Sequence, residues 1–95
     1  MNKGYVYILA SKKDWVLYTW VTNNLSRRIF EHKDNTSEWF TNKYIVKKLV
    51  YFEQYDDIKY AILREKQLKK WKRDWKIKLI EEENLERDDL YDNLY

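Results

Sequence analysis

Turns in this chain must form almost without glycine or proline, and this restricts its fold more than any other feature. There is one glycine, Gly4, and no proline. Globular domains average about 7% glycine and about 5% proline, and glycine supplies the positive φ angles that many tight turns need. Asparagine and aspartate are therefore expected to make the turns, and the pattern is typical of a sequence whose glycines were replaced. The candidate turn residues are Asp14, Asn23, Asn24, Asp34, Asn35, Asn42, Asp56 and Asp57.

The segments between these turns predict an α+β domain. Segments rich in β-branched and aromatic residues predict strands, the first two as an antiparallel hairpin, over residues 4–10, 15–21 and 44–55. Periodic segments that follow Asn or Asp caps predict helices over residues 24–33, 58–72 and 75–83. The caps are Asn24, Asp57 (or Asp56) and Asp74. The order β-β-α-β-α-α predicts a three-stranded antiparallel sheet packed by helices.

The length of the chain, 95 residues, predicts a single domain over residues 1–95 with a modest core. From about residue 84 the sequence is acidic, so this tail is expected to be solvated or loosely docked. The absence of cysteine fits a reducing compartment. No segment has the apolar length of a membrane helix or a signal peptide, so a cytoplasmic protein without a membrane partner is expected. The net charge of +3 is too small to indicate nucleic acid by itself.

Polar side chains share the apolar faces of the first two helices. In the first helix Leu25 and Ile29 form an inward stripe that Arg28 and His32 complete. In the second helix Glu65 falls in the middle of the stripe formed by Ile58, Ala61, Ile62 and Leu68. Burying such groups costs free energy unless they pair or do chemistry. Two interpretations stay open: a buried Arg28–Glu65 ion pair with a core histidine, or a functional cluster.

Aromatic residues on the predicted hairpin favour the functional cluster. Tyr5 and Tyr7 share one face of the first strand, and Tyr18 and Trp20 share one face of the second. If that face meets the helices, phenol groups gather near the arginine, the histidine and the glutamate. This set suits phosphodiester hydrolysis, because a phenol or imidazole can help to activate water and a guanidinium can stabilise phosphate charge. The single carboxylate can bind one divalent metal.

The spacing of these residues resembles the GIY-YIG nuclease family, in its small stand-alone bacterial, UPF0213-like form, over roughly residues 3–92. The segment Tyr5-Val6-Tyr7 corresponds to the first signature element, and Tyr18-Thr19-Trp20 to the second. RRIFEH aligns with the segment of the catalytic arginine, and REKQLKKW with that of the metal-binding glutamate. The resemblance implies metal-dependent DNA cleavage with one Mg²⁺ or similar ion. The implied catalytic residues are Tyr7, Tyr18, Arg28 and His32, with Glu65 as the metal ligand.

The sequence departs from the family where glycines are expected. Trp20 replaces the glycine of the second signature element, and Trp39 replaces a usual glycine before Phe40. A glycine beside a catalytic tyrosine leaves bare backbone that a phosphate can approach closely. An indole fills that space, so impaired catalysis is expected.

The large residues at these positions allow two interpretations: they fill the core of the domain, or they face outward as contact area. Tryptophan and tyrosine are common anchors of protein interfaces. The second interpretation predicts a scaffold resurfaced, by engineering, to bind another protein or itself. Its candidate interface residues are Trp15, Val16, Trp20, Trp39, Tyr60 and Leu63. The alternative function is an active nuclease that hydrolyses DNA phosphodiesters with one divalent metal.

The basic segment KKWKRDWKIK, residues 69–78, suggests a third function, nucleic-acid binding without cleavage. Its lysines and arginine interleave with Trp71 and Trp75, as in surfaces that stack bases. The ordinary alternative is that Trp75, Leu79 and Ile80 form a core stripe and the lysines a solvated face.

Overall fold

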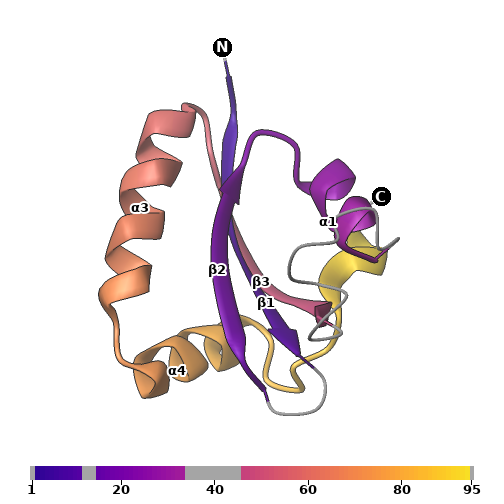
Figure 1. Ribbon diagram of the computed structural model, residues 1–95. Coiled ribbons are helices and arrows are strands. Elements are labelled where there is room, and N and C mark those ends of the chain that lie inside the picture. The colour runs from indigo at the N-terminus through magenta and orange to yellow at the C-terminus, as the bar shows by residue number, and fades with distance from the viewer. Residues whose placement is uncertain (1, 12–14, 34–45, 95) are drawn as a thin grey trace.

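The structure is a computed structural model that describes residues 2–11, 15–33 and 46–94. The elements are β1 (Gly4–Ser11), β2 (Leu17–Thr22), α1 (Leu25–Lys33), β3 (Val46–Tyr55), α3 (Ile58–Lys70), α4 (Arg73–Glu83) and a short 3-10 helix, η1 (Leu90–Asn93) (Figure 1). The predicted α+β class and element order are confirmed. The sequence did not predict η1.

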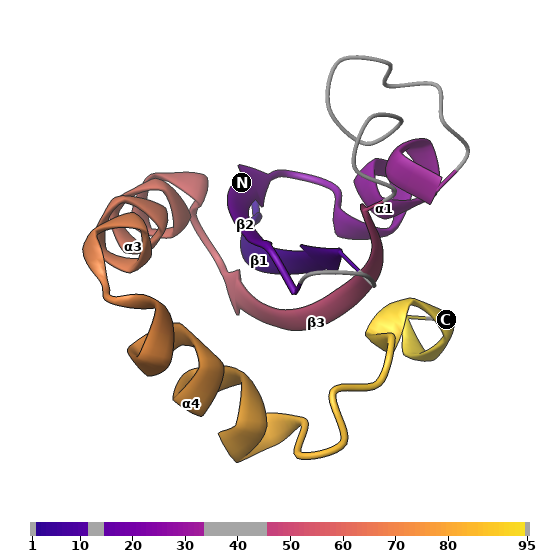
Figure 2. The ribbon, with the colours of Figure 1, turned by 60° about the horizontal axis from the view of Figure 1, so that its bottom comes forward.

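The three strands form one antiparallel sheet in the order β2-β1-β3. Tyr7 on the central strand lies opposite Trp20 on β2 and Phe52 on β3. Because side chains alternate along a strand, Tyr5, Tyr7, Tyr18 and Trp20 share one side of the sheet, here called the tyrosine face. Figure 2 shows α1 and the C-terminal segment on one side of the sheet, and α3 and α4 on the other.

Separate hydrophobic clusters form on the two sides of the sheet. On the tyrosine face, Leu25 and Ile29 of α1 pack against Tyr7, as the stripe in α1 predicts. On the opposite face, Ala61 and Leu68 of α3 pack against Val6. The prediction that Ile62 belongs to the inward stripe of α3 is wrong, because its side chain is 38% exposed. The sheet has only three strands, so it covers a narrow stripe of the helix.

Two of the three predicted helix caps are confirmed. The Asn24 side-chain oxygen accepts a hydrogen bond from the backbone N–H of Arg27 at 3.3 Å. The Asp57 carboxylate accepts one from the backbone N–H of Lys59 at 3.0 Å. Asp74 lies inside the first turn of α4 rather than at its cap, because the helix begins at Arg73 and its N-cap residue is Lys72.

A glutamate network joins β3 to α3 on the face opposite the tyrosine face. The hydroxyls of Tyr51 and Tyr55 donate hydrogen bonds to the Glu53 carboxylate, and Arg64 donates from Nε and Nη2 at 3.1–3.3 Å. Burial opposes the charge on Glu53, but these donors outweigh it and hold the pKa of the carboxyl below its ordinary value. The tyrosine and arginine donors of this network all bind the Glu53 carboxylate, and the network links α3 to the sheet.

The acidic tail packs on the domain along its described residues, 84–94, rather than lying loosely docked. The buried Asn84 amide donates to the carbonyl oxygens of Val50 and Asp88, and the backbone N–H of Leu49 donates to the Asp89 carboxylate at 3.1 Å. Leu90, Tyr91 and Leu94 of this segment pack against the cluster on the tyrosine face, whereas Leu85 is exposed. These hydrogen bonds satisfy backbone groups of β3 and order the tail.

Candidate functional site

Tyr7 lies at the centre of the sheet, with its side chain buried under α1. It is 1% exposed and belongs to the cluster that contains Leu25 and Ile29. Burial raises the pKa of the Tyr7 phenol above its ordinary range, and the nearby positive charge of Arg28 only partly opposes this effect. In this arrangement the phenol is neutral and is shielded from solvent.

Trp20 fills the position that the family resemblance assigns to glycine. It lies directly opposite Tyr7 in the β1–β2 register, and it is half-buried against the same cluster. Its ring also meets α3, where the Lys69 ammonium lies 5.3 Å from the ring centroid. The indole therefore touches both the buried tyrosine cluster and the helix that carries Glu65. This packing supports the interpretation that Trp20 fills the core.

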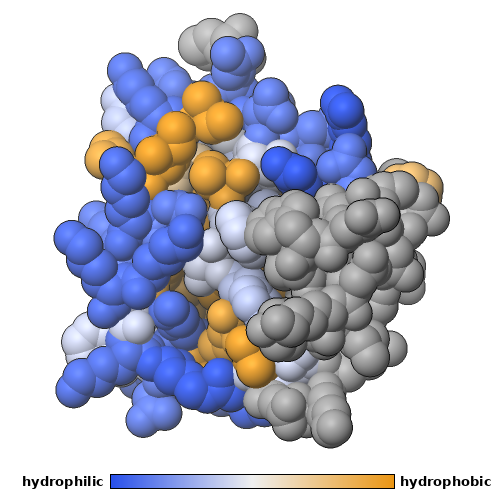
Figure 3. Space-filling model, viewed as in Figure 1, coloured by the Kyte–Doolittle hydropathy of each residue, from blue (hydrophilic) through white to orange (hydrophobic). Residues whose placement is uncertain are grey.

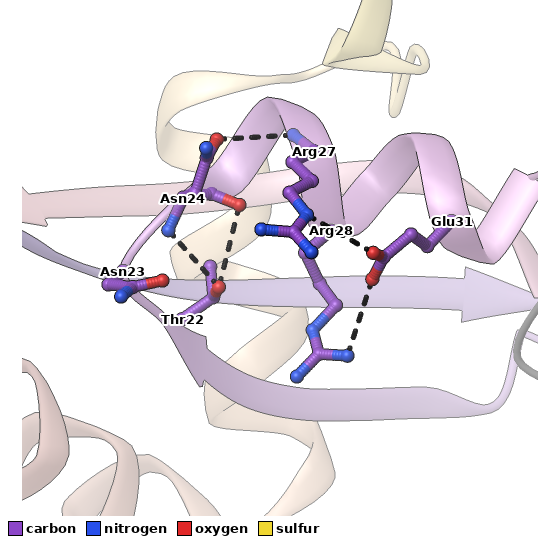
Figure 4. Close-up of a pocket in the computed structure, with 6 residues that line it drawn as sticks. All are labelled: Thr22, Asn23, Asn24, Arg27, Arg28 and Glu31. Atoms are coloured by element: carbon purple, nitrogen blue, oxygen red, sulfur yellow. Dashed lines mark hydrogen bonds and ion pairs between the residues drawn. The ribbon is translucent and has the colours of Figure 1, made fainter.

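Arg28 lines a pocket of about 280 Å³ at the start of α1 (Figure 4). Arg28 and Arg27 both pair with the Glu31 carboxylate, at 3.5 Å and 3.3 Å. The Arg28 side chain is nevertheless 43% exposed, so its guanidinium is accessible from the pocket. Two guanidinium groups face one carboxylate here, which leaves a net positive charge at the mouth of the pocket.

Short polar residues shape the floor of this pocket and fix the start of α1. The backbone N–H of Asn24 donates to the Thr22 hydroxyl at 3.2 Å, and that hydroxyl donates back to the Asn24 carbonyl at 3.4 Å. Sequence analysis singled out neither Thr22 nor Glu31. The helical spacing of Glu31, four residues after Arg27 and three after Arg28, was the available signal.

Glu65 projects from α3, on the side of the sheet opposite Arg28. Its side chain is 13% exposed, and its carboxylate pairs with Lys69 at 3.0 Å. The interpretation of a buried Arg28–Glu65 ion pair is therefore wrong, because each residue pairs with a neighbour on its own helix. Helical periodicity gives the inward side of each helix, but it does not say which face of the sheet that side meets.

In this arrangement, an ion pair occupies the carboxylate that the resemblance assigns to a divalent metal. No group of three or more histidine, cysteine, aspartate or glutamate side chains gathers among them. The one carboxylate that the resemblance assigns to metal binding, Glu65, is already neutralised by the ammonium of Lys69. A hard cation such as Mg²⁺ would have to displace that ammonium and take its remaining ligands from water or substrate.

The predicted catalytic residues Tyr7, Tyr18 and Arg28 are found in different surroundings. Tyr18 and Trp20 line a second pocket, of about 230 Å³, at the outer edge of β2, together with Leu17, Thr19, Lys69 and Lys76. Arg28 lines the first pocket, and Tyr7 is buried between strand and helix. The His32 side chain lies outside the described residues. Sequence analysis noted Lys69 and Lys76 only as part of the basic segment.

The candidate interface residues divide into buried and exposed groups. Trp15 is half-buried, with the Arg87 guanidinium 4.5 Å from its ring centroid, and Trp20 is half-buried as described above. Trp39 lies outside the described residues. The exposed members are Val16 at 40%, Tyr60 at 54% and Leu63 at 57%.

Trp75 does not belong to the core. Its side chain is 56% exposed and meets Trp71 edge to face, with ring centroids 6.0 Å apart. Ile80 of the same proposed stripe is fully buried. The core interpretation of this segment is therefore right for Ile80 and wrong for Trp75.

Comparison with known proteins gives consistent matches. Residues 3–78 match the family model of the GIY-YIG catalytic domain. A UPF0213 protein of Clostridium perfringens is 42% identical over 90 residues, which cover 90% of this chain and 96% of that protein. A UPF0213 protein of Staphylococcus saprophyticus is 35% identical, over 86% of this chain and 99% of that protein.

A solved structure is also similar to the chain. The solution NMR structure of a UPF0213 protein from Bacillus halodurans matches with a TM-score of 0.56 and 28% identity, over 86% of each chain. These matches support a small protein of the GIY-YIG family. They give no support to the prediction of an engineered, resurfaced chain. Within the described residues, no helix is long and apolar enough to cross a membrane.

Proposed function

Since the chain belongs to the GIY-YIG family, we propose that it is a nuclease-fold protein that contacts DNA phosphates through Arg28 and cleaves DNA poorly, because Trp20 closes the site. The family makes DNA the natural partner to test. The finer part of the proposal, reduced cleavage, comes from residues of this chain that depart from the family pattern.

One observation carries the proposal: Tyr7 is 1% exposed and lies directly opposite Trp20. A phenol that assists hydrolysis must come within about 2.6–3.2 Å of the attacking water or the phosphate. A tryptophan in place of glycine adds a large ring at the position where backbone would otherwise be bare. The Lys69–Glu65 ion pair adds a second obstacle, since it occupies the carboxylate.

The Arg28 pocket supports the DNA-contact part of the proposal. Its guanidinium is 43% exposed, its neighbour Arg27 adds a second positive charge, and Glu31 orients both. An arginine held in this way can donate paired hydrogen bonds to phosphate oxygens. Such contacts position DNA without reading its sequence.

Arg28→Ala is expected to weaken binding of a fluorescent DNA duplex roughly tenfold, because a hydrogen bond to a charged group contributes about 1.5 kcal/mol. The slope of log K against log salt should fall by about one. Fluorescence anisotropy in Mg²⁺-free buffer at several salt concentrations measures both quantities. Lys59→Ala is the matched control, since Lys59 is an exposed cation on the far end of α3. Equal losses in the two variants would remove Arg28 from the DNA contact.

A second candidate function is self-association through the outer side of α3. Tyr60, Ile62 and Leu63 are 54%, 38% and 57% exposed and lie within one turn of the helix. Figure 3 shows hydrophobic side chains gathered over the N-terminal half of α3. Contiguous exposed apolar residues often mark protein contacts. This supports a dimer as the alternative to a purely DNA-binding role.

If α3 forms a dimer contact, Leu63→Glu should convert the dimer to a monomer that stays folded, because Leu63 is 57% exposed. Size-exclusion chromatography with light scattering measures the mass of each variant. Lys66→Glu on the same helix is the control for added negative charge. A wild-type protein that is monomeric at all concentrations would exclude this second candidate.

A further inference from the structure

We propose that Lys69 and Lys76 form a second phosphate-binding site at the outer edge of β2, which holds the nucleic-acid backbone next to the Arg28 pocket. This inference rests on the proposed DNA-binding function and names a further site for it. The two lysines come from different helices, α3 and α4, and line one pocket of about 230 Å³ with Tyr18, Thr19 and Trp20.

The charges of the residues that line this pocket favour binding of an anion. Lys76 is partly buried, and within the described chain no carboxylate lies within ion-pair distance of it. Burial, followed by the repulsion of Lys69, lowers the pKa of the Lys76 ammonium. Lys69 pairs with Glu65, so the pocket keeps a net positive charge. Holding two ammonium groups together costs free energy that a bound anion would recover.

A buried hydroxyl at the same place has no hydrogen-bond partner among the described residues. Thr19 is 6% exposed, and its Oγ1 is the buried atom concerned. Buried polar groups are normally hydrogen-bonded. A phosphate oxygen that entered the pocket could accept a hydrogen bond from this hydroxyl after a small side-chain rotation.

The placement of the two pockets favours an extended polymer over an isolated phosphate. The first pocket lies at the Thr22 end of β2, and the second is lined by residues 17–20 of the same strand. At about 3.3 Å per residue, the pockets are roughly 10–15 Å apart along the strand. This equals about three to four base pairs of duplex along one strand. In the view of Figure 3, the lower left of the molecule, over α4 and the C-terminal end of α3, is largely hydrophilic.

Binding of a fluorescent DNA duplex to two charge-matched variants tests the proposal. Lys76→Gln should weaken binding roughly five- to tenfold and reduce the salt slope by about one, because one phosphate contact is lost. Lys78→Gln removes the same charge from the same helix, but Lys78 does not line this pocket, so its effect should be small. Equal effects of the two variants would overturn the proposal.

A measurement without DNA separates this site from the proposed function. NMR spectra of ¹⁵N-labelled lysine ammonium groups are recorded while inorganic phosphate is added. The Lys76 signal should shift, and the shift should disappear in Lys69→Gln. Phosphate binding without any duplex binding would keep the two-lysine site and reject the proposed function. No shift at Lys76, together with equal DNA affinity of Lys76→Gln and Lys78→Gln, would reject the site.

Discussion

Trp20→Gly is expected to raise Mg²⁺-dependent nicking of plasmid DNA at least tenfold over the unmodified chain. The change removes the ring that lies opposite Tyr7 and against Lys69, which opens space beside the phenol and removes the cation–π contact of Lys69. A tenfold gain corresponds to about 1.4 kcal/mol of barrier. Glu65→Ala in the same chain should abolish the gain, because it removes the carboxylate that the family resemblance assigns to the metal. Gel analysis of supercoiled, nicked and linear plasmid measures the activity.

The controls for this experiment separate site opening from loss of packing. Trp20 packs on the core cluster, so its removal should cost about 3–5 kcal/mol of unfolding free energy. Circular dichroism must therefore show a folded variant, and Trp20→Ser serves as a second small residue at this position. Trp75→Gly removes an exposed tryptophan far from Tyr7 and should not increase nicking. No gain in a folded Trp20 variant would show that the indole is not what limits cleavage.

Gly4→Val is expected to destabilise the fold by about 3 kcal/mol or more. A Cβ atom at Gly4 would lie 2.6 Å from the Cα atom of Ile58 and 2.9 Å from the Cβ atom of Ala61. The first contact is with backbone, so relief requires α3 to move away from β1. The backbone N–H of Ile58 also donates to the Asn2 carbonyl at 2.9 Å, which ties the two elements together. Overpacking of this kind typically costs about 1–3 kcal/mol even for smaller additions.

Thermal unfolding followed by circular dichroism measures the effect of this substitution. For a domain of this size, 3 kcal/mol lowers the melting temperature by on the order of 15 °C. Lys3→Val places the same side chain at the exposed neighbouring position and should change stability by less than about 0.5 kcal/mol. Equal melting temperatures for both variants would contradict the close packing of β1 on α3. This packing explains why the single glycine of the chain is at this position.

The sequence predicted the strands and helices well because the local signals agreed with the tertiary structure. Segments rich in β-branched and aromatic residues marked the strands, and Asn24 and Asp57 capped the helices that they were predicted to cap. The inward stripe of α1 was correct for Leu25 and Ile29, which are buried, and wrong for Arg28, whose side chain is 43% exposed. The position of Glu65 on the inner side of α3 was also correct, since its side chain is 13% exposed.

The arrangement of the candidate site could not be predicted, because periodicity does not assign helices to faces of a sheet. Glu65 lies on the inner side of α3, whereas Arg28 on α1 is 43% exposed, and the sheet lies between the two helices (Figure 2). The acidic tail was misjudged for a similar reason. Its charges suggested solvation, whereas specific hydrogen bonds from Asn84 and to Asp89 hold it on β3. Such contacts span 34–40 residues of sequence and leave no local pattern.

Binding and cleavage of one labelled DNA duplex, measured in the same Mg²⁺-containing sample, test the central claim most directly. Anisotropy reports the bound fraction, and denaturing gel electrophoresis of the same sample reports intact strands. The unmodified chain is expected to bind the duplex, with affinity reduced by Arg28→Ala, and to leave nearly all strands intact. Efficient Mg²⁺-dependent cleavage by the unmodified chain, lost in Glu65→Ala, would contradict the claim that Trp20 closes the site.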